Sequence, residues 1–205
     1  MLIRILNDVH LFGISPTHTF SEIVTAISAS PYPVYVNGDV VDIATCKHNE
    51  LPRAFQAMVL LINLVNKSGG TYIRGNHECN STNNIDQLLI ADMILFTHGD
   101  IPMWGEKKSA AFRNQRRGAG WFKRVVISGL ISKLRRFITV RPNDNLKQWV
   151  MDQKQANPKL KACLFGHSHP PQHMFFEYAG VQCAILKRGV NDVDVNLATG
   201  AIMAV

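Results

Sequence analysis

Five apolar runs in the first four-fifths of the chain each end in a polar cluster built from the same few residue types. The runs at 2–7, 34–36, 71–73, 93–97 and 161–165 have the length and composition of buried strands. The clusters that follow them are Asp8-Val9-His10, Gly38-Asp39-Val40-Val41-Asp42, Gly75-Asn76-His77-Glu78, His98-Gly99-Asp100 and Gly166-His167-Ser168-His169. Because ligands bind outside the carboxyl ends of strands in open α/β sheets, we expect these clusters to meet at one site.

The remaining pattern supports an α/β architecture. Helical periodicity covers 19–29, 51–66 and 143–156, so helices alternate with the strand-like runs. After Pro170-Pro171 the chain has strand patterns at 174–178, 181–186, 193–197 and 201–205 with no helix between them, which predicts an antiparallel ending. The chain has 205 residues, 46% of them hydrophobic, without repeats or linkers, so we expect one domain over 1–205.

The composition of the clusters indicates a metal site. Each cluster by itself is ordinary turn chemistry, but together they hold five of the eight histidines beside carboxylate and amide oxygens. Such ligands without thiolates suit manganese, iron, zinc, cobalt or nickel. Two neighbouring divalent ions need a shared carboxylate, and they lower the pKa of bound water to about 7, which suits hydrolysis at phosphorus. The four cysteines are widely spaced, which predicts reduced thiols in a cytosolic compartment.

The order of the five motifs, over residues 8 to 169, resembles the calcineurin-like metallophosphoesterase superfamily. The resemblance implies a four-layer sandwich in which two mixed β-sheets pack together with helices outside. It implies two divalent ions, manganese first among them, and a hydroxide held between them that attacks a phosphomonoester or phosphodiester. The implied ligands are Asp8, His10, Asp39 and His169 for one ion, and Asp39, Asn76, His98 and His167 for the other, with Asp39 as the bridge.

The resemblance also assigns roles next to the metal ions. It implies that His77 is not a ligand and instead contacts the phosphoryl group or protonates the leaving oxygen, while Asp42 orients His77. A carboxylate fixes the imidazole tautomer and raises its basicity, so the pairing is chemically sound. Glu78 is expected to support the site from behind, and Arg74 is expected to pair with an acid rather than with substrate.

A basic segment interrupts the pattern at 107–141. It holds half of the 22 Lys and Arg residues and no Asp or Glu, and its apolar residues between Trp121 and Ile138 have helical spacing. A helical insert of this kind is either packed in the core with a solvated cationic face or serves as a lid at an anionic lipid surface. The segment resembles the lid of enzymes that cleave UDP-diacylglucosamine, although those enzymes usually carry arginine where this chain has His77. The positive charge of the segment would also suit binding to nucleic acid.

The sequence therefore predicts a metal-dependent phosphoesterase acting on a small phosphorylated substrate. A nucleotide-lipid pyrophosphatase and a nuclease remain as alternatives. A scaffold without metal is disfavoured, since every expected ligand position carries a competent side chain. A protein substrate is disfavoured too, because Ile43-Ala44 stand where protein serine/threonine phosphatases of the superfamily have Arg-Gly. No leader pattern or membrane-length apolar run is present, so we expect a cytoplasmic protein, with peripheral membrane contact as the alternative. The oligomeric state stays open.

Overall fold

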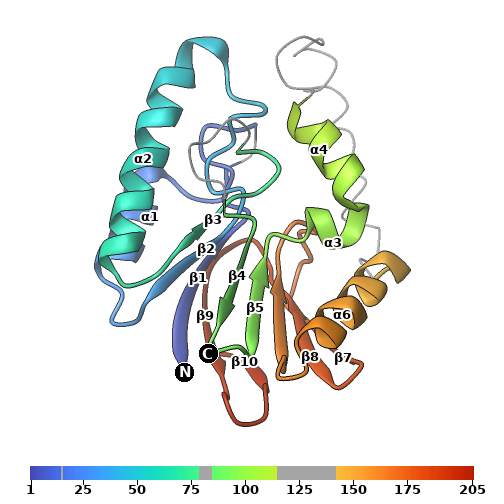
Figure 1. Cartoon of the computed structure of the whole chain (residues 1–205). Coiled ribbons are helices and arrows are strands. Elements are labelled where there is room, and N and C mark those ends of the chain that lie inside the picture. Colours follow the sequence, from blue (N-terminus) through green and yellow to red (C-terminus); the bar gives the residue numbers. More distant parts are fainter. Residues whose placement is uncertain (15, 79–84, 115–141) are drawn as a thin grey trace.

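The computed structural model describes residues 1–205 except 15, 79–84 and 115–141, and it describes the backbone alone at 112–114. Two five-stranded mixed sheets form its centre (Figure 1). The first sheet has the strand order β10 (Ile202–Ala204), β9 (Gly189–Val195), β1 (Leu2–Asn7), β2 (Val34–Asn37) and β3 (Tyr72–Ile73). The second has the order β4 (Gln87–Ile90), β5 (Ile94–Thr97), β6 (Ala162–Phe165), β8 (Val181–Ile185) and β7 (Met174–Tyr178).

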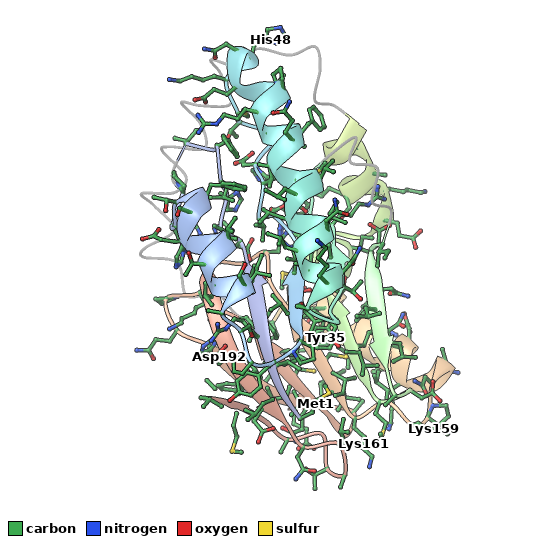
Figure 2. All side chains as sticks on the ribbon, turned by 90° about the vertical axis from the view of Figure 1, so that its left-hand side faces the viewer. Met1, Tyr35, His48, Lys159, Lys161 and Asp192 are labelled. Atoms are coloured by element: carbon green, nitrogen blue, oxygen red, sulfur yellow. The ribbon has the colours of Figure 1, made fainter. Side chains whose placement is uncertain are left out.

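Helices cover the outer faces of both sheets. The described helices are α1 (Phe20–Ser28), α2 (Leu51–Lys67), α3 (Asp100–Trp104), α4 (Glu106–Asn114) and α6 (Asp144–Ala156), with a 3-10 turn at His48–Glu50. The first two lie side by side over the first sheet (Figure 2), whereas the other three lie on the side of the second sheet (Figure 1). The predicted four-layer sandwich is therefore confirmed.

Three apolar clusters connect these layers. Ile23 of α1 and Leu61 of α2 pack with Val36 of β2 over the outer face of the first sheet. Ile5 of β1 and Phe96 of β5 belong to the cluster that joins the two sheets. The outer face of the second sheet packs against α6 through Leu146 and Val150. Alternate residues of a strand face opposite sides of the sheet. Since the central strands contribute to apolar clusters on both sides, they are apolar on both faces.

The N-terminus of α1 shows how local sequence defines an element. Thr19 caps the helix by accepting a hydrogen bond from the backbone N–H of Glu22, at 3.3 Å. The carboxylate of Glu22 accepts one in return from the N–H of Thr19, at 2.6 Å. This reciprocal capping box starts the helix at Phe20, one residue after the predicted start at Thr19.

The strand β4 was not predicted from the sequence. Its side chains alternate between exposed and half-buried, as expected of an edge strand. It joins β5 through Ala91 and Asp92, which both have positive φ, at 51° and 58°. Aspartate is a common residue in such turns, but alanine disfavours a positive φ, so the sequence carries only a weak signal for this hairpin.

The ending of the chain departs from one continuous antiparallel arrangement. The pairs β7–β8 and β9–β10 are antiparallel as expected, but β8 also pairs parallel with β6. The chain then crosses to the first sheet, where β9 runs antiparallel to β1. It begins at Gly189, four residues before the expected start, and this places the preceding turn beside the end of β1.

Candidate metal centre

The polar clusters converge where β1, β2, β3, β5 and β6 end. These strands run parallel within their own sheets, so their carboxyl ends point the same way. The structure brings together all seven side chains that the resemblance implies as ligands. Six of them are buried and His169 is half-buried; the seven are Asp8, His10, Asp39, Asn76, His98, His167 and His169. A site of this kind at strand ends across both sheets is where an α/β protein binds ligands.

Five of these seven residues have a left-handed backbone. Their φ angles are 51° for Asp8, 57° for His10, 54° for Asp39, 68° for His167 and 49° for His169. Each such conformation of a residue other than glycine costs about 1–3 kcal/mol. The surrounding structure therefore holds these side chains in place against a local preference, which is characteristic of binding and catalytic sites.

One donor group consists of Asp8, His10 and His169. The Nε2 atom of His169 lies 2.8 Å from Oδ1 of Asp8, and the Nε2 atom of His10 lies 3.8 Å from the same oxygen. The two imidazole Nε2 atoms face each other at 3.3 Å. A cation between them would accept both lone pairs, and these three residues could hold one.

A second donor group consists of Asp39, His98 and His167. The Nε2 atom of His98 lies 3.1 Å from Oδ2 of Asp39 and 3.3 Å from Nδ1 of His167. The amide oxygen of Asn76 adds a fourth donor, 3.1 Å from the same Nε2 atom. Asp39 also belongs to a group with His10 and His77, so the two donor groups are contiguous through its carboxylate.

Hydrogen bonds on the far side of the rings orient two of the imidazoles. The Nδ1 atom of His98 donates to the backbone carbonyl of Asn37, at 2.9 Å. The Nδ1 atom of His10 lies 3.2 Å from Oδ2 of Asp42. Because each Nδ1 faces an acceptor, each Nε2 is left to point its lone pair into the site, as metal-binding histidines require.

Glycine permits the close approach of the strand ends. Gly38 has a φ of 86°, and a side chain there would collide with the imidazole of His98. At Gly166 a Cβ atom would lie 2.8 Å from Oδ2 of Asp8 and would collide with the amide oxygen of Asn7. Glycine is thus required at both positions so that backbone and donor side chains can share the space.

The carboxylates of the site are ionised. Burial would raise the pKa of Asp8, but the neighbouring imidazoles of His169, His98 and His10 hold that pKa well below its usual range. Burial likewise opposes ionisation of Asp39, and His98 and His77 lower its pKa despite this. Negative charge is therefore available to a cation at the centre of the site.

The pKa values of two of the imidazoles are raised, whereas those of the carboxylates are lowered. Burial disfavours the charged form of His10, but hydrogen bonds to Asp42 and Asp8 raise its pKa to about 9. Burial acts in the same direction on His98, and the carboxylates of Asp39 and Asp8 raise its pKa to about 10. Without a cation these rings hold protons against the carboxylates, and a bound metal ion takes the place of those protons.

The expected partner of His77 is also in place. The Oδ1 atom of Asp42 lies 3.0 Å from Nδ1 of His77, whose side chain is 22% exposed at the edge of the site. Thr45 holds the same carboxylate, donating its backbone N–H to Oδ1 at 2.9 Å and its hydroxyl to Oδ2 at 2.7 Å. Asp42 is thus itself fixed and can orient an imidazole.

Glu78 lies behind the site, as expected from the sequence. Its buried carboxylate accepts hydrogen bonds from the N–H groups of Val40, Val41 and Gly75, at 2.7, 3.0 and 2.9 Å, and from the hydroxyl of Tyr72. Burial and the charge of Asp39 raise the pKa of Glu78. The side chain ties the loop that carries Asp39 to the loop that carries Asn76.

Other sequence-predicted residues lie outside the donor groups. Arg74 pairs with Asp86, with its Nε at 2.6 Å from Oδ1, as expected for an arginine that does not serve the substrate. His18, His48 and His173, which match no motif, belong to none of the donor groups found in the described part of the chain.

Two residues near the site were missed by sequence reasoning. The Nε–H of Arg188 donates to the backbone carbonyl of Asp8, at 2.9 Å. The indole of Trp104 meets the ring of His167 edge-on, with the centroids 4.2 Å apart. Arg188 follows the end of a strand, and this is the one signal that could have identified it. Trp104 belongs to a short helix that the sequence pattern does not predict.

Most of the basic insert, including the predicted lid between Trp121 and Ile138, lies outside the described residues. Within them, Lys107 and Lys108 are exposed on α4, and the amine of Lys108 stands 5.4 Å from the centre of the Trp104 ring. Among the helices that the structure describes, none is long and apolar enough to cross a membrane.

Several solved structures are similar to this chain at low sequence identity. A predicted phosphoesterase from Streptococcus pneumoniae is 12% identical, with a TM-score of 0.42 over 100% of this chain and 97% of its own. A dimetal phosphatase from Danio rerio is 10% identical, with a TM-score of 0.48 over 94% of this chain and 92% of its own. The zinc complex of Vps29 from Entamoeba histolytica is 11% identical, with a TM-score of 0.44 over 100% of this chain and 97% of its own.

The family of this chain follows from its amino-acid sequence rather than from these structures. No curated protein matches the chain. The model of the calcineurin-like phosphoesterases matches residues 1–171, which include all five polar clusters. The chain therefore belongs to the calcineurin-like phosphoesterase family.

Proposed function

We propose that this protein hydrolyses esters of phosphoric acid with the help of two divalent metal ions. The observation that carries the proposal is the pair of donor groups, which a third group of His10, Asp39 and His77 links to each other. Their imidazole, carboxylate and amide donors fit manganese, and equally iron, zinc, cobalt or nickel. Membership of the calcineurin-like phosphoesterase family supports the same reaction class.

The seven convergent side chains would hold the two ions. We assign the first ion to Asp8, His10, Asp39 and His169, and the second to Asp39, Asn76, His98 and His167. When bound, the ions would neutralise charge on the phosphoryl group and lower the pKa of a water molecule toward neutrality. The buried carboxylates and the oriented imidazoles are what the protein itself contributes to this arrangement.

His77 and Asp42 would complete the reaction. As water adds to phosphorus it would release a proton to solvent, the bond between phosphorus and the leaving oxygen would break, and that oxygen would take a proton from the His77 imidazolium. His77 would then regain a proton from solvent. The hydrogen bond from Nδ1–H of His77 to Asp42 keeps the ring oriented, and in the imidazolium form Nε2–H is left to donate. The partly exposed edge of His77 makes it accessible to a small phosphorylated substrate.

The test is hydrolysis of 4-nitrophenyl phosphate and bis(4-nitrophenyl) phosphate with and without added manganese. We expect activity that requires the metal, is lost with a chelator and is lost in Asp39→Asn. The matched control is Asp152→Asn, which removes an exposed carboxylate on α6 and should leave activity unchanged. Full activity in metal-free protein, or in Asp39→Asn, would reject the proposal.

A further inference from the structure

Helices α3 and α4 lie on one side of the candidate metal centre. The first follows the proposed ligand His98 almost directly, beyond the carboxyl end of β5, and the second continues from it (Figure 1). The sulfur of Met103 in α3 accepts a hydrogen bond from the hydroxyl of Ser168, at 2.8 Å. Ser168 stands between the proposed ligands His167 and His169 in the sequence. The helix is therefore held against the loop that supplies both of these imidazoles.

The indole of Trp104, the last residue of α3, contacts the site directly. It meets the ring of His167 edge-on, with the centroids 4.2 Å apart and the planes at 84°. His167 is buried and belongs to the second donor group, with Asp39 and His98. A side chain that packs on this indole is therefore close to the second proposed metal position.

Lys108 on α4 packs on this indole. Its amine stands 5.4 Å from the centre of the Trp104 ring, a distance at which a cation is attracted to the face of an aromatic ring. Together with the contact between Trp104 and His167, this places the amine within about 10 Å of the centre of the His167 ring, which is about the Debye length at 0.1 M salt. An anion bound at the metal centre is therefore within range of the Lys108 charge.

No acidic residue of the described part of the chain neutralises this charge. The side chain of Lys108 is exposed, and within the described residues no carboxylate forms an ion pair with it. Glu106 lies two positions earlier on the helix, a spacing at which side chains do not face each other. The sequence from 107 to 141 contains no Asp or Glu. The amine therefore keeps its three hydrogen-bond donors for an anion from solution.

We propose that Lys108 binds a second phosphoryl group of the substrate and thereby favours diphosphates, such as nucleoside diphosphates, over simple monoesters, an inference that rests on the proposed function. The donor groups would hold the reacting phosphoryl group, and the second one, joined to it through one oxygen, would extend toward the amine. Lysine binds phosphate as a compact point charge. The residue determines specificity by touching the substrate and is not a metal ligand.

The reaction on a nucleoside diphosphate follows from the proposed hydrolysis. Water adds to the terminal phosphorus, and the bond from that phosphorus to the bridging oxygen breaks. The products are the nucleoside monophosphate, inorganic phosphate and one proton. Lys108 would neutralise charge on the phosphate that leaves with the nucleoside.

The experiment compares uridine 5′-diphosphate (UDP) with uridine 5′-monophosphate (UMP), which share one nucleoside and differ by one phosphate. With manganese, Lys108→Gln should lower kcat/KM for UDP about 10-fold, the loss expected for one hydrogen bond to a charged group. It should change kcat/KM for UMP less than about twofold, since UMP has no second phosphate to lose contact with Lys108. Lys108→Arg, which keeps the charge, should retain most of the activity on UDP. The matched control is Lys107→Gln, which removes the neighbouring exposed charge and should alter neither substrate.

Three results would overturn the inference. Equal losses on UDP and UMP in Lys108→Gln would mean that the lysine attracts anions in general. An equal loss on UDP in Lys107→Gln would have the same meaning. Wild type that hydrolyses UDP and UMP with the same kcat/KM would contradict the preference for diphosphates.

A binding experiment separates this inference from the proposed function. Calorimetric titration with methylenediphosphonate, a diphosphate analogue with a carbon bridge, needs no turnover when manganese is in excess. Lys108→Gln should weaken its binding about 10-fold and leave the binding of inorganic phosphate unchanged. Unchanged affinity for the diphosphonate would overturn the inference. Wild type that binds the diphosphonate through Lys108 but hydrolyses neither the nucleotides nor 4-nitrophenyl phosphate would contradict the proposed function alone.

Discussion

The carboxylate of Asp42 accepts a hydrogen bond from Nδ1 of His10, at 3.2 Å. Its other oxygen lies 3.0 Å from Nδ1 of His77. One side chain therefore joins a proposed metal ligand to the proposed proton donor. This link was not expected from the sequence, which paired Asp42 with His77 alone.

The double contact predicts different defects in two variants. Asp42→Asn should weaken manganese binding about 10- to 100-fold, because the imidazole of His10 loses its ionic partner. His77→Asn should leave manganese affinity near the wild-type value, while kcat should fall about 10²- to 10⁴-fold. Calorimetric titration with manganese and steady-state kinetics on 4-nitrophenyl phosphate distinguish the two. If Asp42→Asn bound manganese as tightly as wild type, the contact between Asp42 and His10 would not contribute to metal binding.

Metal binding should stabilise the fold. The donor groups exist only in the folded chain, so manganese at 100 times its Kd should add about 2.7 kcal/mol for each independent site. We expect Tm to rise when manganese is added and to return to its starting value with excess chelator. Asp39→Asn should lose most of this rise because its carboxylate belongs to both sites. An identical rise in wild type and Asp39→Asn would contradict the assignment of Asp39.

Glu78 should contribute strongly to stability. In Glu78→Gln an amide group faces backbone N–H donors of Val40, Val41 and Gly75, so at least one buried donor is left without an acceptor. We expect the free energy of unfolding to fall by about 3 kcal/mol, measured by urea denaturation at pH 7. Tyr72→Phe removes one hydroxyl from the same carboxylate and should cost about 1 kcal/mol. Equal costs for the two variants would be inconsistent with this hydrogen-bond arrangement.

Arg4 and Asp192 predict a pH dependence of stability. The guanidinium donates to both oxygens of Asp192, at 2.7 and 2.8 Å, and to the carbonyl of Ala26 in α1, at 3.0 Å. Figure 2 labels Asp192. The hydrogen bond from Arg4 lowers the pKa of Asp192. A carboxyl with a lowered pKa stabilises the folded state above its unfolded pKa of about 3.9, and the stabilisation is lost as the pH falls further.

Asp192→Asn should therefore be less stable than wild type by about 1 kcal/mol at pH 7. The difference should be constant between about pH 5 and pH 7 and should shrink below about pH 4. Urea denaturation at several pH values measures it, with the exposed Asp152→Asn as the control. A difference that grows as the pH falls would have the wrong sign for this ion pair.

Local patterns were sufficient for much of the fold. The strands β1 and β7 have the predicted bounds, because each is a short run rich in apolar residues with polar or turn residues on either side. The start of α1 was predictable from the capping residues Thr19 and Glu22. In contrast, β4 depends on pairing with β5 through a turn in which Ala91 has positive φ, a conformation that alanine disfavours.

The sequence by itself determined the chemical types at the candidate site, since each cluster is a short segment whose residues and spacing are local properties. Only the tertiary structure decided which of them meet. The contact between Arg188 and the backbone of Asp8 joins residues 180 positions apart, and it exists because β9 crosses to the sheet of β1. Such a crossing follows from how the two sheets pack, and this depends on the summed burial of many side chains rather than on any one segment.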